Sequence, residues 1–470
     1  MAIQIRPARR RFLRRPSCGD PRPEDRLAFI DQATYQLMRT TGRAQLMQCV
    51  WVYEHPVDFD EVRRFHRDFG YGLAGRRIER SPLPFGRHRW VSSEGPAADI
   101  DFAERARPRA ELSDWADERA QLAVDPEWGP GWHLGVLPMT DGSTAVSVAG
   151  SHCLIDGVGA LLTIVDAVKG NTRHLGYPAP KSRTRLRAMA SDARHTVQGM
   201  PEVGRTLVAA AKLAYRHRDD FARPAAAQPL SISADDGEDT VVMPAIAIYV
   251  DLDDWDACAQ SLGGISYSLL AGFAAKFAER MGRVRADDGA VTLLIALSDR
   301  TSLDDTRANA MAFANVSLDP TSVTKDLSGS RVAIRQALKM SRDVPDETLQ
   351  LLPLVPLVPK RALKHVVELF FGQADDLPVS CSNLGDIDPA LGRLDGTDAE
   401  YVLLRGVDQH VSRQAIERIG GQLVVVGGRI NGKISIGVVG YQPGAENTKT
   451  HLREVAAQTL AAFDLSGVID

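Results

Sequence analysis

Residues 149–157 read Ala-Gly-Ser-His-Cys-Leu-Ile-Asp-Gly, and they bring together three residue types that are common at catalytic sites. His152 can take up and release a proton near neutral pH, which suits it to general base catalysis. Asp156 follows four residues later, where charge pairing can pin a carboxylate into a turn, and Gly157 comes directly after it. The simpler interpretation is a partly buried histidine that is hydrogen-bonded to a turn aspartate, so the surrounding sequence has to decide.

That surrounding sequence predicts that His152 lies where a strand gives way to a helix. Residues 144–148 are small or β-branched and predict a strand, whereas residues 158–168 are mostly apolar and predict a buried helix. Upstream, residues 129–138 form another apolar run, and Asp141-Gly142 between the two runs favours a tight hairpin turn. A side chain at such a junction is held by the flanking elements and can still project into a cleft. The context therefore favours the catalytic interpretation.

The stretch from residue 128 to residue 168 resembles the acyltransferases related to chloramphenicol acetyltransferase and nonribosomal condensation domains. It resembles most closely their wax ester synthase/diacylglycerol acyltransferase branch. Those enzymes carry the motif His-His-x-x-x-Asp-Gly. His152 matches the second histidine, which acts as the base in the family, and Ser151 stands where the family has the first. We interpret this departure as a change of local support that leaves the chemistry intact.

Three further segments carry the resemblance, in the family's order along the chain. Residues 26–31 (Arg-Leu-Ala-Phe-Ile-Asp) resemble the short segment that opens family members. Residues 293–300 resemble the family's strand ending in arginine, here Arg300, and Asn309 and Asn315 follow in the loop beyond it. Residues 380–385 resemble the Ser-Asn segment of the second half, here Ser382 and Asn383.

The resemblance implies an α/β fold with two chloramphenicol-acetyltransferase-like halves, each a mixed sheet with helices, packed around a central channel. A chain of 470 residues is long enough for two such halves. We expect a basic flexible arm at residues 1–25 and an N-terminal half with the His152 motif at residues 26–177. A crossover linker is expected at residues 178–240, partly helical and partly mobile, and a C-terminal half at residues 241–470.

The resemblance also implies direct acyl transfer from a thioester, acyl-CoA, to a hydroxyl acceptor, with His152 as the general base. The thioester is a substrate, and no separate cofactor is expected. Asp156 is expected to support the site structurally by pairing with Arg300, and Gly157 to permit the close turn. Ser382 and Asn383 are expected to hold the developing oxyanion or to shape the channel, although ordinary loop capping explains these two residues equally well.

Two alternative functions stay open at this point. One is a condensation-type ester or amide synthase that takes its acyl group from a carrier protein. The other is a non-catalytic member of the superfamily that serves in binding or assembly, which the Ser151 departure makes conceivable. The partners expected are therefore a small-molecule donor and acceptor, with a carrier protein as an alternative donor.

Composition excludes several other classes of protein. The net charge of -4 gives no electrostatic reason to expect nucleic acid as a partner. The five cysteines form no Cys-x-x-Cys pair and the histidines form no ligand cluster, so neither a disulfide framework nor a metal site is expected. Residues 427–433 nearly spell a phosphate-binding loop, but Ile434 stands where a serine or threonine is required. Asn431-Gly432 within that stretch favours a hairpin turn instead.

The N-terminus carries six arginines within its first fifteen residues. Arg10-Arg11-Phe12-Leu13 is similar to a twin-arginine export signal, but the apolar stretch that such a signal needs does not follow. The remaining interpretations are a weak anchor for an anionic membrane surface and a solvated flexible tail. No segment is apolar for long enough to span a bilayer, so we expect a cytoplasmic protein, with peripheral membrane contact as the alternative. Residues 351–359 contain three prolines, cannot form a regular helix, and are expected to be a buried connector.

A coarse pass along the remaining chain predicts alternating elements. We expect strands at residues 45–54, 87–91, 246–250 and 293–300, helices at residues 60–69, 111–124, 207–215 and 266–281, and a C-terminal hairpin formed by residues 422–430 and 433–439.

Overall fold

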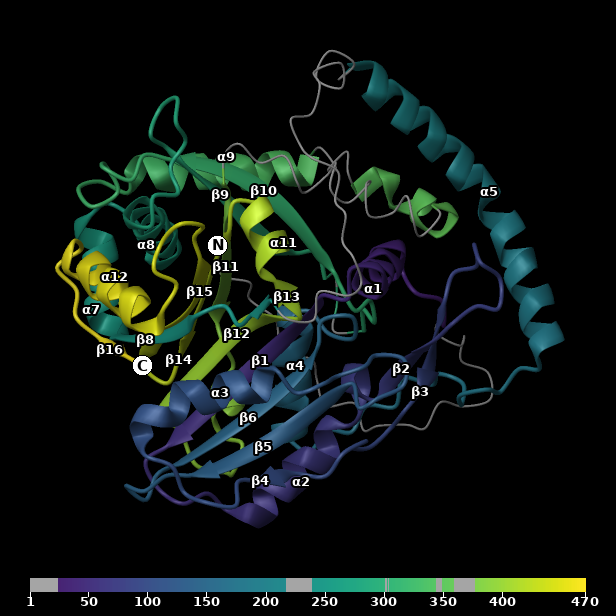
Figure 1. Cartoon of the computed structure of the whole chain (residues 1–470), viewed down its shortest axis with the longest axis horizontal. Helices are drawn as coiled ribbons and strands as arrows, with labels where there is room; N and C mark the ends of the chain where they lie inside the picture. The colour runs from purple at the N-terminus through teal and green to yellow at the C-terminus, as the bar shows by residue number, and fades with distance from the viewer. Residues whose placement is uncertain (1–23, 217–238, 301, 303, 344–348, 359–376) are drawn as a thin grey trace.

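The computed structural model describes residues 24–216, 239–300, 302, 304–343, 349–358 and 377–470, which form two lobes that lie side by side (Figure 1). Each lobe is built on one mixed sheet, of five strands in the first lobe and seven in the second. The expected α/β fold with two lobes is confirmed. The basic arm lies outside the described residues up to residue 23, as do residues 217–238 of the crossover linker.

The strands in chain order are β1 (Ala44–Tyr53), β2 (Arg76–Glu79), β3 (Arg89–Ser92), β4 (Asp101–Phe102), β5 (Trp132–Pro138), β6 (Thr144–Ser151), β7 (Thr240–Val241), β8 (Ala245–Asp251), β9 (Val291–Ser298), β10 (Met311–Leu318), β11 (Val379–Asp386), β12 (Tyr401–Gln409), β13 (Val411–Ser412), β14 (Gln422–Ile430), β15 (Lys433–Tyr441) and β16 (Val468–Ile469). The α-helices are α1 (Phe29–Thr41), α2 (Phe59–Phe69), α3 (Leu112–Ala120), α4 (Gly157–Val168), α5 (Arg185–Arg216), α7 (Leu252–Ser261), α8 (Ser266–Arg280), α9 (Ser328–Asp343), α11 (Arg413–Arg418) and α12 (Lys449–Ala461). Short 3-10 helices are η1 (Gly72–Ala74), η2 (Arg109–Glu111), η3 (Leu349–Leu357) and η4 (Pro389–Gly392).

The sheet of the first lobe has the order β12-β1-β6-β5-β4. Its strands pair antiparallel except for β4 and β5, which run parallel. The β5–β6 hairpin matches the prediction, and β6 runs directly into the turn that carries His152. Helices α2 and α4 pack against each other, and side chains from both helices join the core formed with the sheet, including Phe65, Ile164 and Trp51.

One strand of this first sheet comes from the second half of the chain. β12 pairs antiparallel with β1 along nine residue pairs, from Ala44 opposite Gln409 to Val52 opposite Tyr401. A division of the chain at residues 178–240 therefore does not coincide with the boundary between the two sheets.

The second sheet has the order β10-β9-β11-β14-β15-β8-β16. β11 lies between β9 and β14 and runs parallel to both, while the other pairs are antiparallel. Helix α8 is packed into this lobe's core and buries Leu269, Phe273 and Phe277 completely. The predicted β14–β15 hairpin is present, and both turn residues, Asn431 (φ 49°) and Gly432 (φ 72°), are left-handed as that turn type requires.

The segment that joins the lobes differs from the short helical stretches expected there. Helix α5 is one continuous helix of 32 residues that runs along the outer side of the molecule (Figure 1). It packs against η3, the proline-rich segment, which forms a 3-10 helix and is mostly half-buried. Across the described ranges, no helix is long and apolar enough to cross a membrane.

Candidate active site

Each lobe forms a hydrogen bond to the backbone of His152, and these two bonds hold the turn that carries it. The His152 amide donates to the Gln45 carbonyl of β1 at 2.8 Å. On the other side, the Asn309 side-chain amide, from the loop between β9 and β10, approaches the His152 carbonyl at 3.4 Å. The peptide unit of His152 is therefore fixed between the two halves of the chain.

The imidazole of His152 is partly exposed, but its Nδ1 atom is buried and has no hydrogen-bond partner among the residues that the structure describes. Ser151, beside it, is 1% exposed, and its hydroxyl accepts a hydrogen bond from the Cys153 amide at 3.3 Å. Ser151 thus takes part in the local turn. Burial raises the pKa of the Cys153 thiol to about 12, so Cys153 is a neutral thiol at neutral pH.

Asp156 is buried and both of its carboxylate oxygens are fully engaged. Arg300 Nη2 donates to Oδ1 and Oδ2 at 2.9 Å each, and the side chains of the pair are 4% and 5% exposed for Arg300 and Asp156. The amide of Gly159 donates to Oδ1 at 2.6 Å, which caps α4, and the amide of Ala310 donates to Oδ2 at 2.8 Å. The structure thus brings together Asp156 and Arg300, and the carboxylate ties the start of α4 to the loop after β9.

A second buried carboxylate belongs to Asp31 of α1, which the motif pattern does not mark as a functional residue. Asp31 is 0% exposed and accepts hydrogen bonds from the Ala308 amide (3.0 Å), the Asn309 amide (2.8 Å) and the Asn309 side chain (3.2 Å). Burial raises the pKa of Asp31 above its ordinary value, against the lowering effects of Arg76 and these hydrogen bonds. Asp31 therefore orients Asn309, which in turn contacts the His152 carbonyl.

The asparagines after β9 have different positions. Asn309 is buried in the network just described, whereas Asn315 is exposed on β10, away from it. One sequence signal could have pointed to Asp31. It is an aspartate in the first turn of an amphipathic helix, with apolar residues around it.

Two glycines near the motif have different structural roles. Gly157 is not left-handed, and a Cβ added there would make ordinary contacts with Met47 at 3.5 Å and Leu384 at 3.7 Å. At Gly159 a Cβ would lie 2.9 Å from Asp156 Oδ1 and 3.1 Å from Leu73 Cδ1, closer than side chains normally approach. The close approach of α4 to Asp156 therefore depends on Gly159, which the sequence analysis did not single out.

Ser382 and Asn383 lie near the end of β11. Leu384, the residue of this strand that follows them, reaches the start of α4. The Asn383 side-chain oxygen accepts a hydrogen bond from the Gly385 amide at 2.9 Å, which is ordinary loop capping. Ser382 pairs with Val426, whose side chain lines the pocket between the sheets, so the Ser382 side chain lies on the same face of its sheet, toward the first lobe. Of the two residues, Ser382 is the one whose position suits contact with a molecule bound between the lobes.

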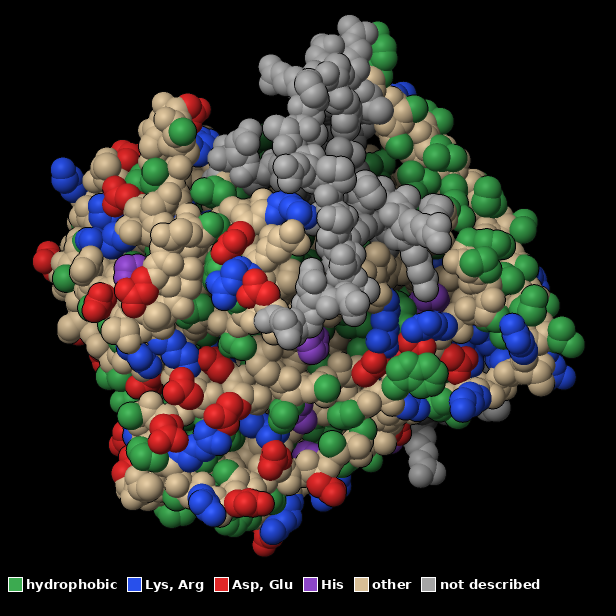
Figure 2. Space-filling model, viewed as in Figure 1, with side chains coloured by type: hydrophobic (Ala, Val, Ile, Leu, Met, Phe, Trp, Pro, Cys, Tyr) green, Lys and Arg blue, Asp and Glu red, His purple; other side chains and the backbone are tan. Residues whose placement is uncertain are grey.

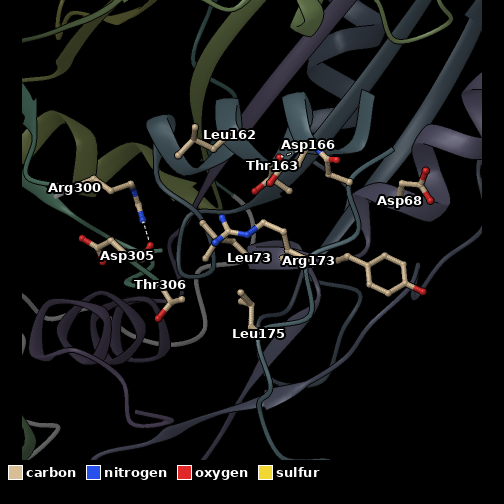
Figure 3. A pocket seen from close by; sticks show the side chains of 13 residues that line it. Asp68, Leu73, Leu162, Thr163, Asp166, Arg173, Leu175, Arg300, Asp305 and Thr306 are labelled. Atoms are coloured by element: carbon tan, nitrogen blue, oxygen red, sulfur yellow. Dashed lines mark hydrogen bonds between the residues drawn. The ribbon is translucent and has the colours of Figure 1, made fainter. Parts of the chain in front are cut away.

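Two small pockets lie close to the elements described above. The first lies between the sheets and is lined by strands β11, β12, β14 and β15 and the segment after β11, with Leu384 at its wall. The second is lined by α4, the segment after α2, the segment after α4, and the loop with Arg300. Figure 3 shows charged side chains on opposite sides of this second pocket, with Arg300 and Asp305 at the left, Asp166 at the upper right and the Arg173 guanidinium between them. His152 lines neither of the two pockets.

Within the described part of the chain, no group of three or more histidine, cysteine, aspartate or glutamate residues could hold a metal ion. The four described cysteines, Cys49, Cys153, Cys258 and Cys381, are free thiols.

The fold is shared with several acyl-transferring and condensing proteins. The chain is similar to the first condensation domain of the calcium-dependent antibiotic synthetase, with 11% identity, a TM-score of 0.56, and coverage of 94% of this chain and 99% of that one. It is similar to the wax ester synthase/diacylglycerol acyltransferase from Marinobacter aquaeolei VT8, with 14% identity, a TM-score of 0.51, and coverage of 93% and 98%. It is also similar to a trichothecene 15-O-acetyltransferase from Fusarium sporotrichioides, with 10% identity, a TM-score of 0.54, and coverage of 93% and 94%.

These likenesses extend over nearly the whole length of both chains, and they confirm the two-lobed condensation-domain fold that the sequence motifs indicate. No protein-family model matches the sequence. No curated protein matches it either.

Proposed function

We propose that this protein is an acyltransferase that moves an acyl group from a thioester, acyl-CoA, to a hydroxyl acceptor, with His152 as the general base. The observation that carries the proposal is the position of His152. Its backbone is held by Gln45 from one lobe and Asn309 from the other, while its side chain stays partly exposed beside the junction of the lobes. The shared fold with a wax ester synthase and an O-acetyltransferase supports the same reaction class.

In the proposed reaction the ring of His152 takes the proton of the acceptor hydroxyl as its oxygen attacks the thioester carbonyl. The tetrahedral intermediate then collapses, the carbon–sulfur bond breaks, and the leaving thiolate receives the proton back from the imidazolium. No serine or cysteine nucleophile takes part. A site between the lobes excludes water and so suppresses hydrolysis of the thioester.

The other residues of the site would position the reacting groups or contact the developing oxyanion. Asp156 and Arg300 are positioning residues, because their pair joins α4 to the loop that holds Asn309 and because both Asp156 oxygens are occupied. Ser382, on the face of β11 turned toward the first lobe, is the candidate donor to the developing oxyanion. Asn383 would shape the end of the strand through its bond to the Gly385 amide.

The test is acceptor-dependent thiol release with a panel of acyl-CoA donors and of alcohols and amines. Removing a general base lowers turnover by about 10²–10⁴-fold, so His152→Ala should lose activity to that extent while its unfolding curve stays unchanged. His451→Ala, a histidine on α12 in the second lobe, is the matched control and should keep full activity. Full acceptor-dependent activity in His152→Ala would show that the proposed base is wrong.

The likeness to a condensation domain favours one further candidate, an ester or amide synthase with a carrier-bound donor. A donor presented on a carrier protein that reacts while the free CoA thioester does not would favour this candidate. A protein that binds thioesters but never releases thiol with any donor or acceptor would instead be a non-catalytic member of the superfamily.

A further inference from the structure

Helix α5 exposes a continuous apolar stripe. Six of its apolar side chains are between 39% and 80% exposed: Leu186 (80%), Met189 (39%), Val197 (70%), Met200 (48%), Leu207 (55%) and Val208 (56%). Their spacing of three, eight, three, seven and one residues follows the helical repeat, so all six lie on one side of the helix. The intervening positions on that side are exposed and small, as with Ala193 and Gly204.

Basic side chains flank this stripe. Arg187, Arg194, Arg205 and Lys212 are all exposed and are spaced seven, eleven and seven residues apart, which is about two, three and two helical turns. They form a second stripe roughly a quarter-turn around the axis from the apolar one. None of the four forms an ion pair with a carboxylate in the described ranges.

The opposite side of α5 rests on the rest of the molecule. Ala188 and Val203 are buried, and Asp192 accepts hydrogen bonds from Arg183 at 2.8 Å and from the Ser81 hydroxyl at 2.6 Å. Asp192 is one of only two acidic residues in the helix, and it is turned inward and neutralised. The outward side therefore combines apolar and positive surface, and Glu202, the other acid of the helix, is exposed roughly half a turn around the axis from the apolar stripe.

We propose that this outward face of α5 binds the surface of an anionic lipid membrane. Interfacial helices have this arrangement, an apolar face that enters the boundary of the acyl chains and basic side chains that contact the headgroups. The charge favours an anionic surface over a second copy of this chain, because two such faces would bring like charges together. Figure 2 shows the apolar side chains gathered along the outer side of α5. The proposal concerns α5 alone and is independent of the N-terminal arginines and of the proposed acyl transfer.

The test is sedimentation of the full-length protein with vesicles of phosphatidylcholine alone and of phosphatidylcholine with a quarter phosphatidylglycerol. We expect binding to the anionic vesicles, weakened by salt. Near such a surface each basic residue is worth about a fivefold change in affinity, so Arg194→Glu/Arg205→Glu should bind at least about thirtyfold more weakly. Val197→Ser/Leu207→Ser should also lose binding, because it removes apolar contact without changing charge.

Matched controls lie on α9, where Val332 and Met340 are 49% and 67% exposed and Arg335 is exposed. Val332→Ser/Met340→Ser and Arg335→Glu should bind anionic vesicles like the unaltered chain. Thiol release from a soluble donor without vesicles should be unchanged in the α5 variants, which separates this proposal from the proposed acyl transfer. Full vesicle binding by both α5 variants would overturn the proposal. So would a concentration-dependent dimer that Val197→Ser/Leu207→Ser abolishes while neither protein binds vesicles.

Discussion

Removing the positive partner of Asp156 should destabilise the protein strongly. In Arg300→Met the methionine keeps part of the apolar stem, but the Asp156 carboxylate, 5% exposed, loses the one charged partner that it has among the described residues. The amides of Gly159 and Ala310 remain as hydrogen-bond donors, and they do not neutralise the charge. An uncompensated buried carboxylate costs about 3–5 kcal/mol, so the free energy of unfolding should fall by that amount. The measurement is urea unfolding followed by tryptophan fluorescence at neutral pH.

The same change at an exposed ion pair provides the control. Arg393 pairs with Asp398 at 2.8 Å, but the two side chains are 53% and 58% exposed, so Arg393→Met should cost about 0–1 kcal/mol. Adding Asp156→Asn to Arg300→Met should cost less than the two single changes summed, because the second change no longer strands a charge. If Arg300→Met destabilises the protein no more than Arg393→Met does, the pair does not join α4 to the loop in the way described.

Two further predictions concern packing and protonation near the site. Gly159→Ala places a Cβ 2.9 Å from Asp156 Oδ1 and should lower the free energy of unfolding in urea by about 1–3 kcal/mol. Gly157→Ala, whose Cβ contacts are 3.5 and 3.7 Å, should lower it by less than about 1 kcal/mol. Equal effects of the two variants would contradict this account. Burial lowers the pKa of His133 from 6.5 to about 4, so the unfolded chain takes up a proton first as pH falls. The contribution of His133 to stability is complete above pH 6.5 and is lost as pH falls toward 4, by about 3 kcal/mol. His133→Asn should lose less stability than the unaltered chain between pH 7 and pH 4, and identical pH profiles would refute the assignment.

Local patterning predicts much of the first lobe. The β5–β6 hairpin and the helix after His152 follow from alternation, from Asp141-Gly142 and from an apolar run, and all three are local signals. The Asn431-Gly432 hairpin is equally local, since the two residues themselves supply the left-handed conformations. The observed bounds of α2 and α8 differ from the expected ones by a single residue at one end.

Contacts between distant segments were not predictable in the same way. Residues 401–409 were not expected to form a strand, and nothing in their sequence names β1 as a partner. The role of Asp31 depends on a loop 277 residues away, so only the folded chain places its carboxylate beside Ala308. Helix α5 was expected only at residues 207–215. The apolar face of a helix this long is usually buried, whereas the apolar stripe of α5 is exposed.

The pairing of β12, from the second half of the chain, with β1 determines whether fragments of this protein can fold. A chain that stops before residue 401 would leave the edge of β1, including Trp51 and Val52, unpaired, and an uncovered apolar edge invites pairing with other molecules. During synthesis β1 must therefore wait for more than three hundred further residues before β12 pairs with it, which exposes the first sheet to slow folding and chaperone capture. Attempts to produce the His152 half alone should yield aggregates, whereas co-expression with a separate segment containing residues 401–409 should restore soluble protein.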